Sequence, residues 1–458
     1  MEISKNPNIK KANKIKILNQ GSYGCIFRPG IACDKTPLSN RYISKLQRKK
    51  NTSKNETELG KIIKQIPHYE DYFAPIIESC EISLTTIDDN EITKCAFVQQ
   101  DKAEKQKKYE EELAELAAKS NNTIAKTTTT TKTPLSYETN KIRYVGKETL
   151  LDYFLNTFKK NPKNTMKNII TTNIDLLDGL NKLETIKIIH FDLKENNIMI
   201  DDKSKRPIII DFGLSYTDDA IAMGNPSSPT KNDIEKLKKV FFTYGPDYEP
   251  WCIDICFLTF IYNLVEDPIQ DKIQDKILRS DIEDILLDFF SKNNTVKEIL
   301  SETEKSNYQN ELMKYFMLFE NKPWIELVKE LVKNKYTWDN YSLCVIYLYV
   351  LKYLSDSSKE MNTNNENLKV LDEYKNIITQ QVISLPNKRL STIQLKDSLK
   401  TIFKNIDRKD HLEMKTKIEK ILKTKIQTNT DQDISSKIKT KQINELKNEI
   451  NIYMKKLV

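Results

Sequence analysis

The segment that most constrains the fold of this 458-residue chain runs from His190 to Gly213 and reads HFDLKENNIMIDDKSKRPIIIDFG. Two short apolar runs, IMI and PIII, are joined by the polar stretch DDKSKR, a pattern that predicts two strands and a turn. Asp192, Lys194 and Asn197 precede the first run, and Asp211 follows the second. Because a strand pair returns the chain to its starting point, we expect these four side chains to lie at one end of the pair.

These four residue types suit the transfer of a phosphoryl group. Moving the γ-phosphoryl group of ATP requires metal ions held by acidic and amide side chains, a cation on the phosphates and a carboxylate beside the acceptor hydroxyl. The segment offers two carboxylates, a lysine and an amide. Each residue taken alone would be an ordinary turn residue. Their joint spacing is what predicts a catalytic site.

The pattern H-x-D-x-K-x-x-N followed by D-F-G resembles the catalytic and metal-binding loops of the eukaryotic protein kinase superfamily. The resemblance implies Asp192 as catalytic base, Lys194 on the transferred phosphate, and Asn197 and Asp211 as ligands of Mg²⁺ or Mn²⁺. The lysine at position 194 resembles the serine/threonine branch of these kinases rather than the tyrosine branch. The implied activity is therefore ATP-dependent phosphorylation of Ser/Thr hydroxyls on protein substrates.

The segment LNQGSYGCIF resembles the phosphate loop of the kinases. Gly21 and Gly24 stand at the second and third glycine positions of that loop, where a missing Cβ lets backbone N–H groups approach phosphate, and Asn19 stands at the first. Flanking apolar residues would cover the adenine. The resemblance implies the following nucleotide-binding residues: Leu18, Gly21, Ser22, Tyr23, Gly24, Ile26, Lys45, Glu58 and Met199.

Lys45 in YISKL resembles the strand lysine that holds the α- and β-phosphates. Its partner should be a glutamate on the next helix, either Glu58 or Glu56. Glu58 is preferred because Ile62, one turn later, can face the core.

Three further kinase features are expected downstream. YGPDYEPW stands in the place of the A-P-E segment, with Asp247 or Glu249 as its acid. Asp254 resembles the aspartate that braces the backbone of the catalytic loop. Arg389 resembles the late arginine that pairs with the A-P-E acid. Phe191 occupies a position that is arginine in many kinases, so a phosphorylated activation segment would have no charge partner there.

The resemblance implies a two-lobed α+β protein kinase fold, with a small antiparallel β-sheet lobe that carries one helix and a larger helical lobe. The kinase domain is expected over residues 14–405, followed by a Lys-rich helical extension over 406–458. The N-lobe would span about 14–145 with an insertion at 99–136, and the C-lobe about 147–405 with an insertion within 267–380. Apolar periodicity predicts helices over 55–66 and 166–186, and a charged helical pattern predicts one over 101–119. The segment 252–265 is apolar on most faces, which predicts a buried helix.

Composition narrows the class of protein. Charged residues make up 30% and hydrophobic residues 38%, with 9 Gly and 15 Pro, which excludes collagen-like and Gly/Pro-rich disordered chains. The seven cysteines are an odd number spread over a long chain, so we expect thiols in a reducing compartment and no disulfide framework. No apolar stretch is long enough for a membrane span, and the N-terminus has no apolar signal region. The expectation is a soluble, intracellular protein.

Partners are suggested by charge and by a narrower resemblance. The lysines of residues 411–458 are better explained as a solvated helical face than as a nucleic-acid patch, so nucleic acid is not expected as a partner. GSYGCIF, HFDLKENN and YGPDYEPW together are most similar to the divergent protein kinases of large DNA viruses. That similarity implies host proteins among the partners, and the host cytoplasm or the virion as the location.

Two other functions remain open. A small-molecule kinase of the aminoglycoside or choline type also resembles H-x-D-x-x-x-x-N, but Lys194 and the D-F-G favour a protein kinase. A pseudokinase that serves as an interaction scaffold is the alternative from another class. The presence of Lys45, Asp192 and Asp211 argues against it.

Overall fold

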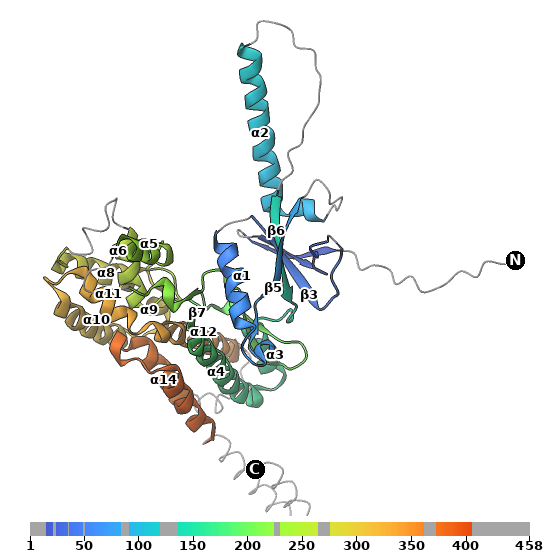
Figure 1. Ribbon diagram of the computed structural model, residues 1–458. Coiled ribbons are helices and arrows are strands. Elements are labelled where there is room, and N and C mark those ends of the chain that lie inside the picture. The colour runs from blue at the N-terminus through green and yellow to red at the C-terminus, as the bar shows by residue number, and fades with distance from the viewer. Residues whose placement is uncertain are drawn as a thin grey trace, which may run out of the picture. The chain divides into compact units, whose positions relative to one another are not determined.

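The computed structural model divides into two compact units, residues 1–399 and 400–458. The structure describes residues 15–21, 24–34, 36–48, 51–83, 91–119, 136–223, 230–263, 275–360 and 372–404. The predicted C-terminal extension at 406–458 lies outside the described residues. The first unit contains a sheet region and a larger helical region (Figure 1).

The sheet region is a five-stranded antiparallel sheet in the order β1-β2-β3-β6-β5. Its strands are β1 (Lys16–Gly21), β2 (Gly24–Arg28), β3 (Tyr42–Gln47), β5 (Ile76–Ser83) and β6 (Ser136–Arg143). Strands β1, β2 and β3 are consecutive along the chain and pair antiparallel, as a hairpin followed by a third strand. Strand β6 pairs with β3 and β5, so the chain that leaves the sheet toward the helical region starts from a central strand.

Helix α1 (Asn51–Ile63) packs against β5, and its apolar residues Leu59 and Ile63 are buried (Figure 1). It begins four residues before the predicted helix at 55–66. Helix α2 (Ala96–Lys119) takes up much of the predicted insertion at 99–136. Its first turn belongs to the core of the sheet region, because Phe97 and Val98 are buried with Phe27 and Leu46.

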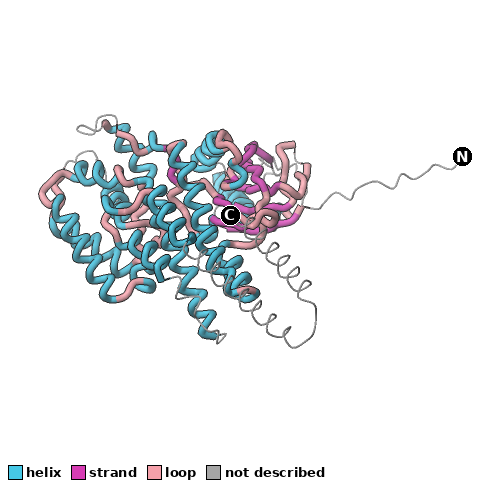
Figure 2. Tube along the Cα trace, turned by 90° about the horizontal axis from the view of Figure 1, so that it is seen from below, coloured by secondary structure: helices cyan, strands magenta, loops and turns pink. Residues whose placement is uncertain are grey.

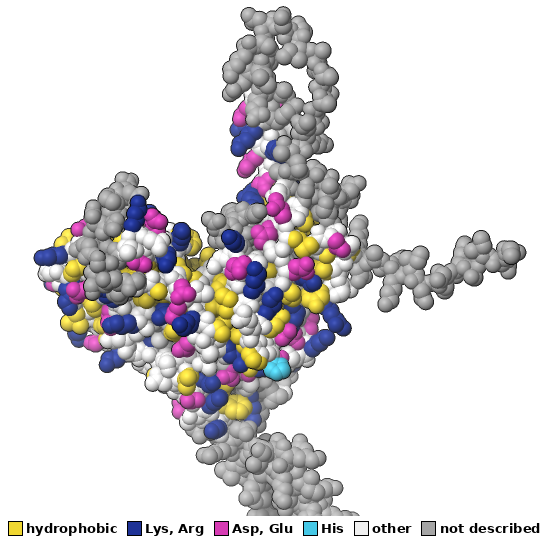
Figure 3. Space-filling view, viewed as in Figure 1, with side chains coloured by type: hydrophobic (Ala, Val, Ile, Leu, Met, Phe, Trp, Pro, Cys, Tyr) yellow, Lys and Arg dark blue, Asp and Glu magenta, His cyan; other side chains and the backbone are white. Residues whose placement is uncertain are grey.

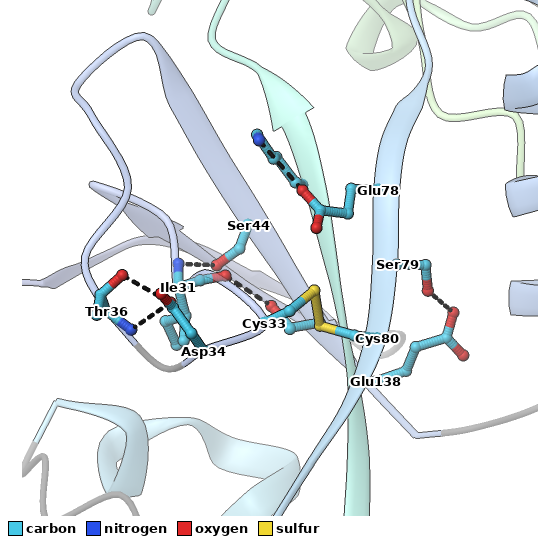
Figure 4. Close-up of a disulfide and its surroundings, with 11 residues drawn as sticks. Ile31, Cys33, Asp34, Thr36, Ser44, Glu78, Ser79, Cys80 and Glu138 are labelled. Carbon is cyan, nitrogen blue, oxygen red and sulfur yellow. Dashed lines mark hydrogen bonds and ion pairs between the residues drawn. A yellow bond between two sulfur atoms is a disulfide. The ribbon is translucent and has the colours of Figure 1, made fainter.

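Two disulfides join parts of the sheet region. Cys25 on β2 is bonded to Cys95, which immediately precedes α2, and Cys33 in the loop after β2 is bonded to Cys80 on β5. Figure 4 shows the second bond, beside the hydrogen bond from the Ile31 amide to the Ser44 hydroxyl (2.9 Å). The expectation of free thiols is wrong for these four cysteines. The sequence separates the partners by 70 and 47 residues, and only the sheet brings them together.

The helical region follows β6, and Figure 2 shows its helices gathered beside the strands. Its helices are α3 (Leu150–Lys160), α4 (Pro162–Thr185), α5 (Lys231–Val240), α6 (Ile253–Asn263), α8 (Arg279–Lys292), α9 (Asn294–Ile299), α10 (Glu302–Phe316), α11 (Trp324–Val332), α12 (Trp338–Glu360) and α14 (Asp372–Ile383). The predicted helices at 166–186 and 252–265 correspond to α4 and α6. Among the described residues, no helix is long and apolar enough to cross a membrane.

The core of the helical region is rich in aromatic side chains. Phe257 of α6 stacks on Phe316 of α10, with ring centroids 3.8 Å apart. Helices α8 and α11 also contact α6, so neighbouring helices cover it on several sides. This packing explains why α6 is apolar on most faces.

Candidate active site

The predicted strand pair positions the candidate site. Strand β8 (Ile198–Ile200) pairs antiparallel with β9 (Pro207–Ile210), and Ile198 lies opposite Ile209. This register places Asn197 and Asp211 at the same end of the strand pair, as predicted. The short 3-10 helix η4 (Glu195–Asn197) carries Asn197 to that end.

Asp192 is the centre of a hydrogen-bonded cluster. The Lys194 ammonium group donates to both carboxylate oxygens of Asp192, at 3.1 Å to Oδ1 and 3.0 Å to Oδ2. The Asn197 amide donates to the Asp192 carbonyl at 2.8 Å and to Oδ2 at 3.0 Å. The structure thus brings together Asp192, Lys194 and Asn197, three of the four residues that were predicted to lie at one end of the strand pair.

The backbone before Asp192 is held in an unusual conformation. Phe191 has φ = 65°, which is rare for a bulky residue and is maintained only where the surroundings fix it. Both carboxylate oxygens of Asp339 on α12 accept backbone N–H groups there, from His190 at 2.7 Å and from Phe191 at 2.9 Å. The Trp251 indole donates to the Phe191 carbonyl at 3.0 Å. The residue that braces the catalytic loop is therefore Asp339, and the prediction that Asp254 does so is wrong.

Asp254 has a different partner. Its carboxylate receives two hydrogen bonds from the Arg389 guanidinium, at 2.7 Å and 3.0 Å, and one from the Trp338 indole at 3.1 Å. Both members of this ion pair are fully buried. The predicted pairing of Arg389 with Asp247 or Glu249 is thus wrong, and Asp254 is the acid that Arg389 neutralises.

Phe191 itself is packed among aromatic rings. Tyr216, Trp251, Phe241 and Trp338 have ring centroids 5.1, 5.1, 6.0 and 6.3 Å from its own. Tyr216, Phe241 and Trp251 belong to the segment between β9 and α6, and Trp338 is the first residue of α12. Apolar contacts therefore hold this segment against the catalytic loop, at the position where many kinases have an arginine.

Lys45 on β3 forms ion pairs with Glu56 of α1 at 3.3 Å and with Asp211 at 3.0 Å. The preference for Glu58 is wrong, because its side chain is exposed and pairs with Lys61. Burial alone would lower the pKa of Lys45, but attraction by Glu56 and Asp211 outweighs burial and raises this pKa.

The two carboxylates around Lys45 are affected in opposite directions. Burial raises the pKa of Glu56 to about 7, and attraction by Lys45 offsets only part of this effect. For Asp211, desolvation acts in the same upward direction, but the Lys45 charge outweighs it and the pKa is lowered. Asp211 is therefore the carboxylate that is held ionised, as a cation ligand must be.

A pocket of about 500 Å³ contains these groups. Lys45 and Glu56 line it from the sheet region, and Asp192, Lys194 and Asp211 line it from the helical region. Further walls come from Arg48, which follows β3, from Phe97 in the first turn of α2, and from the stretch before α6. The lining residues of that stretch include Phe242, Tyr244, Asp247, Tyr248 and Trp251.

The predicted phosphate loop is only partly described. Ser22 and Tyr23 lie outside the described residues. A Cβ on Gly24 would collide with the Leu46 carbonyl oxygen, so this glycine is required by the close approach of β2 to β3. A Cβ on Gly21 would meet no atom within 4 Å, which leaves the backbone there open to a ligand.

The predicted adenine contacts are dispersed around the junction of the two regions. Ile26 lies opposite Lys45 in the sheet, and the Leu18 side chain is partly exposed on β1. Met199 on β8 packs with Val145 and Ile208. None of the three is among the residues that line the pocket, so their adenine contact stays a prediction.

The oxygen donors at this end of the strand pair fit a hard divalent cation. Asn197 uses its amide nitrogen on Asp192, which leaves the amide oxygen for a metal, and Asp211 adds an ionised carboxylate. Among the described residues no three His, Cys, Asp or Glu side chains form a metal cluster. Mg²⁺ fits such a site because it commonly uses one or two protein oxygens together with substrate phosphates.

Residues 82–221 match the family model of the protein kinase domain. This match supports the eukaryotic-type protein kinase superfamily and a phosphotransferase activity. No curated protein matches the chain. The matched residues include Asp192, Asn197 and Asp211, whereas Lys45 and Glu56 precede them, so their assignment depends on the geometry alone.

The fold is the two-lobed α+β protein kinase fold, with the antiparallel sheet as the small lobe and the helical region as the large lobe. The fold prediction is confirmed. Sequence reasoning missed Asp339 and Tyr248 as residues of the site. Asp339 carried a signal, since it is an acid within the strongly apolar segment WDNYSLCVIYLYVL, where an unpaired charge would be costly.

Proposed function

We propose that this protein transfers the γ-phosphoryl group of ATP to Ser/Thr hydroxyls of protein substrates. One observation carries the proposal: a single pocket joins the Lys45–Glu56 pair of the small lobe to Asp192, Lys194 and Asp211 of the large lobe. The intact ion pair and the clustered carboxylates favour an active kinase over a scaffold.

Each group would have a separate role in the transfer. Lys45 would hold the α- and β-phosphates, Glu56 would orient Lys45, and Asn197 and Asp211 would hold Mg²⁺ or Mn²⁺. The bound metal would neutralise charge on the phosphates. Asp192 would accept the proton of the acceptor hydroxyl, and the rate would come from positioning and from electrostatic stabilisation.

Protein substrates are the proposed partners. On the face shown in Figure 3, Lys/Arg and Asp/Glu side chains of the described residues are interspersed. Nucleic-acid binding would favour a basic stripe, so this mixed surface is in line with the proposal that nucleic acid is not a partner. The host proteins and viral setting suggested by the sequence remain proposals of the same kind.

The test is a transfer assay with purified protein, labelled ATP, Mg²⁺ and generic protein substrates, followed by identification of the phosphorylated residues. Asp192→Asn should abolish transfer and leave nucleotide binding intact, because Asp192 acts on the acceptor. Asp211→Asn should instead weaken Mg²⁺-dependent nucleotide binding. Unchanged transfer by either variant, or phosphate found only on tyrosine, would contradict the proposed activity.

A matched pair of variants tests the small lobe. Glu56→Gln should raise the KM for ATP, because Lys45 loses its ion pair with α1 and keeps only the one with Asp211, the proposed metal ligand. Glu58→Gln, two residues later on the same helix and exposed, should leave the KM for ATP within about twofold of the wild type. Equal effects of the two substitutions would show that the Lys45–Glu56 contact has no part in nucleotide binding.

A further inference from the structure

The hydroxyl group of Tyr248 lies on the carboxylate of Asp192. It donates a hydrogen bond to Asp192 Oδ1, and it accepts one from the Lys194 ammonium group at 3.3 Å. The same ammonium group lies 5.8 Å from the centre of the Tyr248 ring. Tyr248 belongs to YGPDYEPW, well after the catalytic loop in the sequence, so this contact joins two separate parts of the site.

Nucleotide binding would leave some of the hydrogen bonds to Asp192 in place and break others. Oδ2 accepts from Lys194 and Asn197, and Oδ1 accepts from Lys194 and Tyr248. In the proposed reaction Lys194 turns toward the transferred phosphate, and the amide oxygen of Asn197 holds metal. The Tyr248 hydroxyl has no role toward the phosphate or the metal in the proposed reaction. This hydroxyl is therefore the donor that stays on Oδ1 when the nucleotide is bound. On Oδ2 the Asn197 amide nitrogen stays, and the position that Lys194 leaves becomes available to an acceptor hydroxyl.

The backbone around Tyr248 is fixed to the catalytic loop. The Tyr248 amide donates to the Gly245 carbonyl at 3.1 Å, and the Trp251 amide donates to the Tyr248 carbonyl at 3.0 Å. The Trp251 indole then donates to the carbonyl of Phe191, the residue before Asp192. The Tyr248 ring also packs edge-on against the Trp251 ring, with centroids 5.0 Å apart. Donor and acceptor therefore belong to one rigid frame.

We propose that Tyr248 is a positioning residue for phosphoryl transfer, which orients the Asp192 carboxylate so that Oδ2 faces the acceptor hydroxyl. The inference rests on the proposed kinase function. In the transfer step the acceptor oxygen bonds to Pγ, the bond from Pγ to the ADP oxygen breaks, and the acceptor proton moves to Asp192 Oδ2. Tyr248 keeps its own proton throughout.

The test compares Tyr248→Phe with Tyr216→Phe. The first substitution removes the hydroxyl from Asp192 and keeps the ring that packs on Trp251. The second is a matched control, because Tyr216 packs on Phe191 at 5.1 Å and its buried hydroxyl has no hydrogen-bond partner among the described residues. For each variant kcat, the KM for ATP, nucleotide affinity and the melting temperature are measured on a Ser/Thr peptide.

Tyr248→Phe should lower kcat by about 10- to 100-fold, the effect expected when a reacting group is misplaced by a fraction of an ångström. Nucleotide affinity, the KM for ATP and the melting temperature should stay close to wild type, and Tyr216→Phe should keep the wild-type kcat.

Several results would overturn the inference. These are an unchanged kcat in Tyr248→Phe, equal losses in Tyr248→Phe and Tyr216→Phe, and a loss of nucleotide affinity that matches the loss of kcat. Phosphate found on Tyr248 after incubation with ATP would also overturn it, because the hydroxyl would then be an acceptor. If the wild type is active and Tyr248→Phe is equally active, only this inference fails. A wild type that transfers no phosphate would overturn the proposed function together with it.

Discussion

The buried ion pair between Arg389 and Asp254 predicts a large loss of folding stability when one of its charges is removed. Asp254→Asn keeps the shape of the side chain and removes its charge, which leaves a fully buried guanidinium without its counter-ion. Removing one member of a buried pair typically costs about 3–5 kcal/mol, since the remaining charge has lost its solvation in water and its partner in the protein. We expect the large lobe of Asp254→Asn to be destabilised by this amount.

Tryptophan fluorescence during urea unfolding measures this effect. The three tryptophans, Trp251, Trp324 and Trp338, all lie in the large lobe, so the signal reports the lobe that contains the pair. With a slope of roughly 2 kcal/mol per molar urea, a loss of about 4 kcal/mol shifts the midpoint down by roughly 2 M. The double variant Asp254→Leu/Arg389→Met should recover most of the loss, because it removes both buried charges.

The control is Asp247→Asn, at a position from which the sequence predicts a partner for Arg389. Asp247 is exposed, so its substitution should change the free energy of unfolding by less than about 0.5 kcal/mol. The reasoning fails if Asp254→Asn unfolds within 1 kcal/mol of the wild type, about the worth of an exposed pair. It also fails if Asp247→Asn is as damaging as Asp254→Asn.

Three further predictions concern the site. Asp339→Asn leaves a backbone N–H of the catalytic loop facing an amide nitrogen, at a cost of about 1–3 kcal/mol; kcat should fall at least tenfold in a steady-state assay, with nucleotide affinity unchanged. The pKa of Glu56 is raised to about 7, so its stabilising contribution is complete below its ordinary pKa and is lost as the pH rises through 7. Between pH 6 and 8 the melting temperature of Glu56→Gln should therefore rise relative to that of the wild type. The melting temperature of Glu58→Gln should not change relative to the wild type over the same range. Because Phe191 packs on aromatic rings, phosphatase treatment should reduce initial rates by less than tenfold; a larger loss, restored by rephosphorylation within residues 214–245, would refute this.

The sequence predicts the parts of the site that are close together along the chain. Asp192, Lys194 and Asn197 are fixed by one loop, and Asp211 follows by a short strand pair whose register the apolar runs determine. Local spacing is enough for these residues, because few backbone conformations connect them.

Residues that act across the fold are harder to predict. Glu56 and Glu58 differ by two positions on one helix, and which of them meets Lys45 depends on how α1 rotates against the sheet. Asp254 and Asp339 are both acids in apolar helices, so the sequence pattern does not distinguish their roles. The helices α8 to α11 lie between them and shift the bracing acid far beyond its expected place.

The two disulfides of the small lobe differ in their exposure to solvent. Cys33 and Cys80 are partly exposed, whereas Cys25 and Cys95 are buried in the core with Phe27 and Val98. A dissolved thiol must touch a sulfur atom to exchange with it, so it reaches Cys33–Cys80 in the folded lobe and Cys25–Cys95 only when the lobe opens. The slower of the two exchange rates is consequently a measure of how often the sheet separates from the first turn of α2.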